Sequence, residues 1–209
     1  MQLSHYDTYN LLSIVGDVPW YLEQFNPGVA ADDNIKQLAF EKNSLLVTEF
    51  DRIFHDLFNA KGATYKKILE SLKDGARTLS KIKQSIKFAH SGTLSKMIDH
   101  FIVAGFVVKQ YLWSFKTAEP LKQSWYRISD LYMRFYLKVI KPNLGATEDG
   151  GFDQVPLSTM PGVKTHMGLH LESLLMQNRH LLLQKLGILL IDIVRSSPYI
   201  QTKTTTQQG

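Results

Sequence analysis

Residues 61–128 carry the pattern that most constrains how this chain folds: three short stretches of helical apolar spacing, each followed by a turn signal. The first ends at Asp74-Gly75. The second begins at Thr78, a residue type that caps helix N-termini, and the third begins at Ser91. Gly105 stands where the third helix would need a C-cap. The inward-facing residues of the three are Tyr65, Ile68, Leu69 and Leu72; Leu79, Ile82 and Ile86; and Leu94, Met97, Ile98, Phe101 and Ile102.

Two strand-like stretches follow these helices. Phe106–Val108 and Tyr111–Trp113 precede a polar stretch with Pro120, and Ser124–Ile128 comes after it. Three short helices and then a two-stranded ribbon are the order of a winged helix-turn-helix. The sequence therefore predicts a mainly α (α+β) fold.

The positive charge is concentrated in the same segment. Between Lys61 and Arg127 there are 13 Lys and Arg against four Asp and Glu, a net of +9, while the rest of the chain carries 11 against 15, a net of −4. Such segregation indicates a local anionic partner, and double-stranded DNA fits a winged helix. A lysine-rich solvated surface, or a module that only packs or oligomerises, explains the same charge.

If the segment binds DNA, its third helix enters the major groove with its N-terminal half. The residues expected at the DNA are Ser91, Thr93, Ser95 and Lys96 on that helix, Lys81, Lys83 and Lys87 on the preceding helix, and Lys109, Lys116 and Lys122 around the wing. The lysines outside the third helix would face phosphates. With one lysine on the presumed recognition helix, we expect little base readout.

The flanking segments complete three predicted parts: a helical segment over 1–60, the winged helix with a following helix over 61–142, and a linker with a further domain over 143–209. Pro142 is expected to stop the aromatic-rich helix that begins at Leu131. Glycines and prolines make 143–162 typical of a connection. A long helix from Val163 would close at Gly187, with a strand starting at Ile188.

The absence of cysteine excludes disulfides, zinc fingers, iron–sulfur clusters and thiol nucleophiles. No apolar stretch is long enough to span a bilayer, and the N-terminus lacks the features of a signal peptide, so we expect a cytoplasmic protein without membrane contact. His166 and His170 stand four apart near Glu172 but lack a further ligand at suitable spacing. We predict no metal, no cofactor and no catalytic residue.

Several blocks of the sequence together resemble a known family. They are Val18–Gln24, Leu46–Phe58, Trp125–Asp130, Arg134–Lys138, Lys141–Asn143, Met167–Glu172 and Pro198–Thr204. In this order they resemble the C-terminal half of archaeal-type ATPases of the AAA superfamily. The resemblance implies a helical lid, a winged helix and the start of an α/β domain that looks like a PD-(D/E)xK nuclease.

The resemblance also shows what this chain lacks. A P-loop needs glycines that cradle phosphate followed by Lys, and no Gly-Lys dipeptide occurs here. Pro19 matches a lid proline that contacts nucleotide in related ATPases, although Gly16-Asp17 replaces the usual glycine pair. The alternative is that Pro19 only starts a helix. Glu172 matches the glutamate on the first helix of the nuclease-like domain and is a remnant that cannot hold a metal alone.

Three functional hypotheses stay open from the sequence. The first is a truncated or decayed ATPase fragment without ATP hydrolysis or nuclease activity, whose winged helix contacts DNA. The second is a free-standing winged-helix DNA-binding module. The third is a subunit, alone or as a homo-oligomer, that a separately encoded P-loop ATPase core completes in trans.

Overall fold

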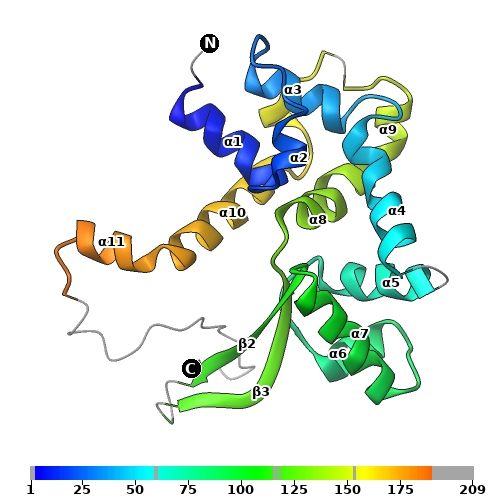
Figure 1. The fold of residues 1–209 in the computed structure, drawn as a ribbon, viewed down its shortest axis with the longest axis vertical. Helices are drawn as coiled ribbons and strands as arrows, with labels where there is room; N and C mark the ends of the chain where they lie inside the picture. Colours follow the sequence, from blue (N-terminus) through cyan, green and yellow to red (C-terminus); the bar gives the residue numbers. More distant parts are fainter. Residues whose placement is uncertain (1–2, 59–60, 115–116, 118, 153, 190–209) are drawn as a thin grey trace, which may run out of the picture.

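The structure, a computed structural model, describes residues 3–189 apart from 59–60, 115–116, 118 and 153 (Figure 1). The described residues form a mainly helical fold with one small antiparallel sheet, as the sequence predicts. The elements are α1 (His5–Val15), α2 (Pro19–Leu22), α3 (Ala31–Ala39), α4 (Leu45–Phe58), α5 (Gly62–Leu72), β1 (Arg77–Thr78), α6 (Leu79–Ser85), α7 (Ser91–Val103), β2 (Val107–Ser114), β3 (Glu119–Ile128), α8 (Leu131–Phe135), a π-helix (Tyr136–Ile140), 3₁₀ turns (Lys141–Asn143 and Leu157–Thr159), α9 (Leu144–Glu148), α10 (Val163–Gln177) and α11 (Arg179–Lys185).

Helices α5, α6 and α7 pack beside the sheet in the lower part of Figure 1. Thr78 caps α6, its hydroxyl accepting a hydrogen bond from the Lys81 N–H at 3.4 Å. Gly105, at φ +80°, turns the chain from α7 into β2, a backbone conformation that favours glycine. The expected helix starts at Thr78 and Ser91 are therefore confirmed.

The ribbon gains a third strand that the sequence does not reveal. β1 pairs with β3, Arg77 opposite Tyr126 and Thr78 opposite Trp125, so the strand order is β1-β3-β2. β2 and β3 form an antiparallel hairpin, with Val107 opposite Ile128. The short strand ties the beginning of α6 to the hairpin, which fixes the orientation of α6 and α7 relative to it.

Pro142 does not stop the helical course of the chain, contrary to expectation. The helix from Leu131 widens into the π-helix, and Pro142 then lies early in a 3₁₀ turn that leads directly into α9. A proline at the start of a helical turn breaks no helix hydrogen bond, because the N–H it lacks would have no partner there.

Residues 143–162, expected as a connection, pack into the core. Phe152, Leu157 and Met160 are buried, and the Phe152 ring lies 5.5 Å from that of Phe40 on the chain after α3. Gly162, at φ +87°, passes so close to the π-helix that a β-carbon there would lie 2.9 Å from the Lys138 carbonyl oxygen. The glycines of this segment serve tight packing as well as turns.

Helix α10 begins inside the core and then leaves it. Val163, His166 and His170 are buried, whereas Leu171, Leu174 and Leu175 are exposed. Figure 1 shows α10 and α11 running away from the other helices. Ile188 and Leu189 form no strand, while the rest of the expected strand, the Pro198–Thr204 block and Lys116 lie outside the described residues.

Candidate functional site

The first candidate site is the surface formed by α6, the start of α7 and the hairpin. Helix α7 buries Leu94, Met97, Ile98 and Phe101. This leaves Ser91, Thr93 and Lys96 exposed, while Ser95 is half-buried at the edge of the exposed face. Four of the expected DNA-facing residues therefore lie on or beside the accessible N-terminal half of α7.

A polar hollow of about 450 Å³ joins the three elements. Its walls are Thr78, Leu79, Ser80 and Lys83 around α6, Ser91 at the start of α7, and Gln123, Ser124 and Tyr126 on β3. The structure thus brings Lys83 and Ser91 together, although eight positions separate them in the chain. The hollow places their polar groups beside the base of the hairpin.

Two of the other lysines lie against aromatic rings of the sheet. Lys81 Nζ is 5.5 Å from the ring centre of Trp125 on β3, and Lys109 Nζ is 5.6 Å from that of Tyr111 on β2. The hydrogen bond with Tyr111 raises the pKa of Lys109, so its positive charge is favoured. Lys87 and Lys122 are exposed.

Ion pairing leaves these cations unneutralised. The ion pairs in this part of the chain use Glu70, which meets Lys73 and Lys141, Asp74, which meets Lys138, and Asp51, which meets Lys66. Among the described residues, no ion pair involves Lys81, Lys83, Lys87, Lys96, Lys109 or Lys122. The acidic residue that shares the outer face of α7 is Asp99, one turn beyond Lys96.

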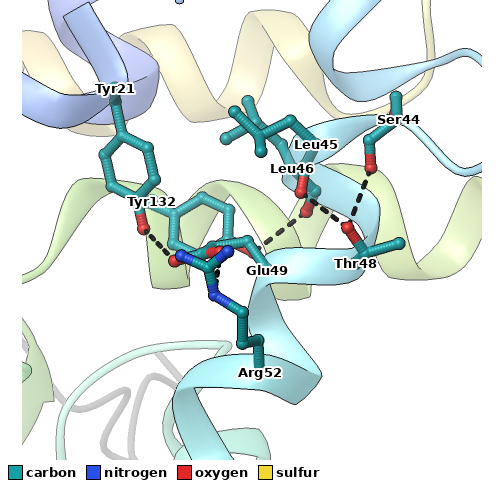
Figure 2. A network of polar contacts seen from close by, with 8 residues as sticks. All are labelled: Tyr21, Ser44, Leu45, Leu46, Thr48, Glu49, Arg52 and Tyr132. Carbon is teal, nitrogen blue, oxygen red and sulfur yellow. Dashed lines mark hydrogen bonds and ion pairs between the residues drawn. The ribbon is translucent and has the colours of Figure 1, made fainter.

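Pro19 lies at a joint between three helices. It is the first residue of α2, and the Trp20 ring that follows carries the Arg52 guanidinium 5.0 Å from its centre. Figure 2 shows the polar side of the joint: the Tyr21 hydroxyl donates to Glu49 at 3.5 Å, and Glu49 pairs with Arg52 at 3.2 Å.

The same joint reaches α8. The Tyr132 hydroxyl donates to the Leu46 carbonyl oxygen at 2.9 Å, as Figure 2 shows. Burial raises the pKa of the Glu49 carboxyl, and it raises the pKa of the Tyr21 hydroxyl as well. Pro19 is thus the first residue of a helix, α2, whose side chains hold α4 and α8 together. Contact of Pro19 with a nucleotide stays a prediction.

Glu172 and the two histidines do not form a metal site. Glu172 is exposed on α10, and among the described residues no group of three potential ligands is close enough to hold a metal. His166 is fully buried with Nε2 2.7 Å from the Ser13 carbonyl oxygen. Burial lowers its pKa to about 4, so the ring is neutral at pH 7.

A second candidate site was not predicted. Between α1, the junction of β3 with α8, and α10 lies a cleft of about 660 Å³ whose polar walls include Arg127, Arg134 and His170. The sequence held one signal of it, a charged residue inside the otherwise apolar and aromatic stretch from Leu131 to Leu137. Its chemistry is developed below.

Comparisons with known proteins add one relative. No family model matches the chain, and no solved structure gives a significant match. The chain is similar to a protein of Methanocaldococcus jannaschii named as uncharacterized protein MJECL04, with 32% identity over 142 residues. The match covers 65% of this chain and 30% of that protein, so the chain spans less than a third of the relative's length. No described helix is long and apolar enough to cross a membrane.

Proposed function

We propose that residues 61–142 are a winged-helix module that binds double-stranded DNA. The observation that carries this proposal is the set of unpaired lysines around the start of α7, on a three-helix and hairpin topology. In this arrangement Thr93 and Lys96 lie in the major groove. Lys81, Lys83 and Lys87 contact phosphates, as do Lys109 and Lys122 beside the wing.

The chemistry of the surface favours affinity over sequence discrimination. Lysines neutralise phosphates and release counterions, which strengthens binding to any duplex. Base readout by hydrogen bonds falls to Thr93, Lys96 and the serines, and of these Lys96 alone can make the two-pronged contact with guanine. We expect a weakly selective DNA-binding protein.

The test compares two charge-matched triple variants on a fluorescently labelled duplex by anisotropy. Replacing Lys81, Lys83 and Lys96 with Gln removes three proposed contacts, and we expect affinity to fall about 100-fold or more at moderate salt. Replacing the exposed Lys42, Lys164 and Lys185 with Gln changes the net charge equally, outside residues 61–142. If both variants lose affinity alike, net charge alone drives binding and the interface is wrong.

We further propose that the module belongs to a protein related to the archaeal-type AAA ATPases. Two of the blocks that carry the resemblance meet at one joint, where Tyr21 of α2 contacts Glu49 of α4, and Tyr132 of α8, which lies between two further blocks, contacts both helices (Figure 2). This lid-like joint would transmit the position of a P-loop core to the winged helix. A core supplied by another chain and a free-standing DNA-binding module remain the two alternatives.

ATPase assays distinguish these alternatives. The chain alone is expected to hydrolyse no ATP, because it contains no P-loop lysine after glycine. If another chain supplies the core, a P-loop protein encoded beside this chain binds it, and addition of the chain changes the rate at which that protein hydrolyses ATP. A Tyr21→Ala change at the joint abolishes that effect, whereas Tyr111→Ala on the hairpin leaves it intact. No effect of the chain on any such protein supports the free-standing module.

A further inference from the structure

The cleft between α1, the β3–α8 junction and α10 has the size of a small-molecule site. Its volume of about 660 Å³ lies within the range of roughly 300–1,000 Å³ typical of such sites. Apolar side chains form part of the wall, namely Leu12, Val15, Leu131 and Leu174. The cleft lies away from the residues proposed to contact DNA, none of which lines it.

Arg134 provides the cleft with a buried cation whose hydrogen bonding is incomplete. It is 8% exposed, and its Nη1 donates to the Leu169 carbonyl oxygen at 3.3 Å and to Ser173 Oγ at 3.2 Å. Its Nε is buried and has no hydrogen-bond partner among the described residues. The Nε edge of a guanidinium is one of the edges that bind an oxyanion through two parallel hydrogen bonds.

His170 adds a second buried polar atom without a partner. The residue is 7% exposed, its ring lies 5.2 Å from that of Tyr9, and its Nδ1 forms no hydrogen bond with the described residues. Burial lowers the pKa of the imidazole, with the Arg134 charge contributing, so the ring is neutral. A neutral imidazole with its proton on Nδ1 donates one hydrogen bond.

Arg127 extends the cationic side of the cleft from the end of β3. Its Nε donates to Gln110 Oε1 at 3.1 Å, which leaves its two terminal nitrogens without protein acceptors among the described residues. Burial lowers the pKa of Arg127, as it lowers that of Arg134. Both guanidinium groups therefore bear a desolvation cost that a bound anion would offset.

Two carboxylates near the cleft act on these arginines at longer range than an ion pair, Glu172 on both and Asp130 on Arg134. Asp130 caps α8 by accepting the Met133 N–H at 2.7 Å, and burial raises the pKa of its carboxyl. Asp17 is exposed at the rim. No carboxylate of the described residues forms an ion pair with Arg127 or Arg134.

From this geometry we propose that the cleft binds a small molecule carrying a phosphate group. The cleft brings two guanidinium groups and one imidazole together, and the two oxygens of a carboxylate, which lie on one side of its carbon, can turn toward only part of this set. A phosphate group presents three or four oxygens in different directions, so it can accept from all three side chains once small side-chain movements open the buried Arg134 Nε and His170 Nδ1 to the cleft. The apolar wall around Leu131 and Leu174 then contacts the rest of the molecule.

Isothermal titration at constant ionic strength tests the site with inorganic phosphate, phenyl phosphate and benzoate. We expect both phosphates to bind, phenyl phosphate more tightly because its ring reaches the apolar wall, and benzoate to bind more weakly than either. Arg127→Gln and His170→Phe should each weaken phosphate binding about tenfold or more, because the first removes a charged donor and the second keeps an aromatic ring beside Tyr9 but removes the N–H donor. The matched controls Arg179→Gln and His180→Phe on exposed α11 should leave it unchanged.

Several outcomes overturn the proposal. One is the absence of heat with both phosphates. Another is equal affinity for benzoate and phenyl phosphate, which refutes the phosphate assignment, and a third is unchanged binding by the Arg127 and His170 variants while circular dichroism shows them folded. The triple variant of Lys81, Lys83 and Lys96 should bind phenyl phosphate normally, so this test stands or fails separately from DNA binding.

Discussion

His166 makes the stability of the fold depend on pH in a calculable way. The ring is fully buried, and its pKa is lowered from 6.5 to about 4, first by burial and also by the nearby Arg134 and His170. Between pH 6.5 and 4, the His166 side chain therefore binds a proton in the unfolded chain but stays neutral in the folded chain. Stability is fully present above pH 6.5 and falls as the pH drops through this window.

The magnitude follows from the two pKa values. The shift of the His166 pKa contributes about 3 kcal/mol to the free energy of unfolding at high pH, and this contribution is lost once the pH has fallen below both pKa values. About 2 kcal/mol of it is lost between pH 8 and pH 5. The assay is urea unfolding at both pH values for the wild type and for His166→Gln. Glutamine can still donate to the Ser13 carbonyl oxygen but cannot titrate.

The difference between the two proteins isolates His166 from the other titrating groups. Asp32, Glu49 and Asp130 have raised pKa values and oppose the histidine as the pH falls, but they contribute equally to both proteins. We expect the free-energy difference between wild type and variant to shrink by about 2 kcal/mol from pH 8 to pH 5. A difference that stays flat, as expected for the exposed control His180→Gln, would refute the reasoning.

Two pairs of substitutions test the packing around the joint and the π-helix by urea unfolding. Gly162→Ala should destabilise the fold by about 1 kcal/mol or more, because the residue has φ +87° and a β-carbon would lie 2.9 Å from the Lys138 oxygen. Gly168→Ala in α10, with open space around it, should stabilise by up to about 1 kcal/mol. Tyr132→Phe should cost about 1 kcal/mol by removing the buried hydrogen bond from the Tyr132 hydroxyl to the Leu46 carbonyl oxygen, whereas exposed Tyr111→Phe should cost little. Equal effects within either pair would contradict the packing described.

The parts of the fold that local chemistry determines were predictable. Thr78 and Ser91 mark helix starts through short-range hydrogen bonding and the return of apolar spacing, and both start where the sequence indicates. β1 was not predictable, because a strand of two residues is too short to show an alternation of apolar and polar side chains. Arg77 and Thr78 become a strand only through their pairing with Tyr126 and Trp125.

Composition misled the prediction for residues 143–162. Glycine and proline are typical of exposed connections, but here Gly162 allows a close approach to the π-helix. The buried Phe152 shows that the segment contributes to the core. Tertiary contacts, which a local pattern does not contain, decide between these two uses of the same residue types.

The two candidate sites likewise differ in how far the sequence could predict them. The basic surface was predictable because charge segregation survives in the sequence, and the structure added the hollow shared by Lys83 and Ser91. The cleft was not, since Arg134 meets Leu169 and Ser173 from 35 and 39 positions further along the chain. Residues so far apart in the sequence follow no local pattern that would predict their contact. A lone arginine among apolar residues was the one available signal.

The salt dependence of DNA binding tests the central claim most directly. If the lysines around α6, α7 and the hairpin neutralise about five phosphates, the logarithm of the association constant should fall with the logarithm of salt concentration at a slope near −4 to −5. Anisotropy titrations at about 50 and 200 mM salt should then differ about 250- to 1,000-fold in affinity. Absence of binding at the lower salt concentration, or binding that salt leaves unchanged, would contradict the account.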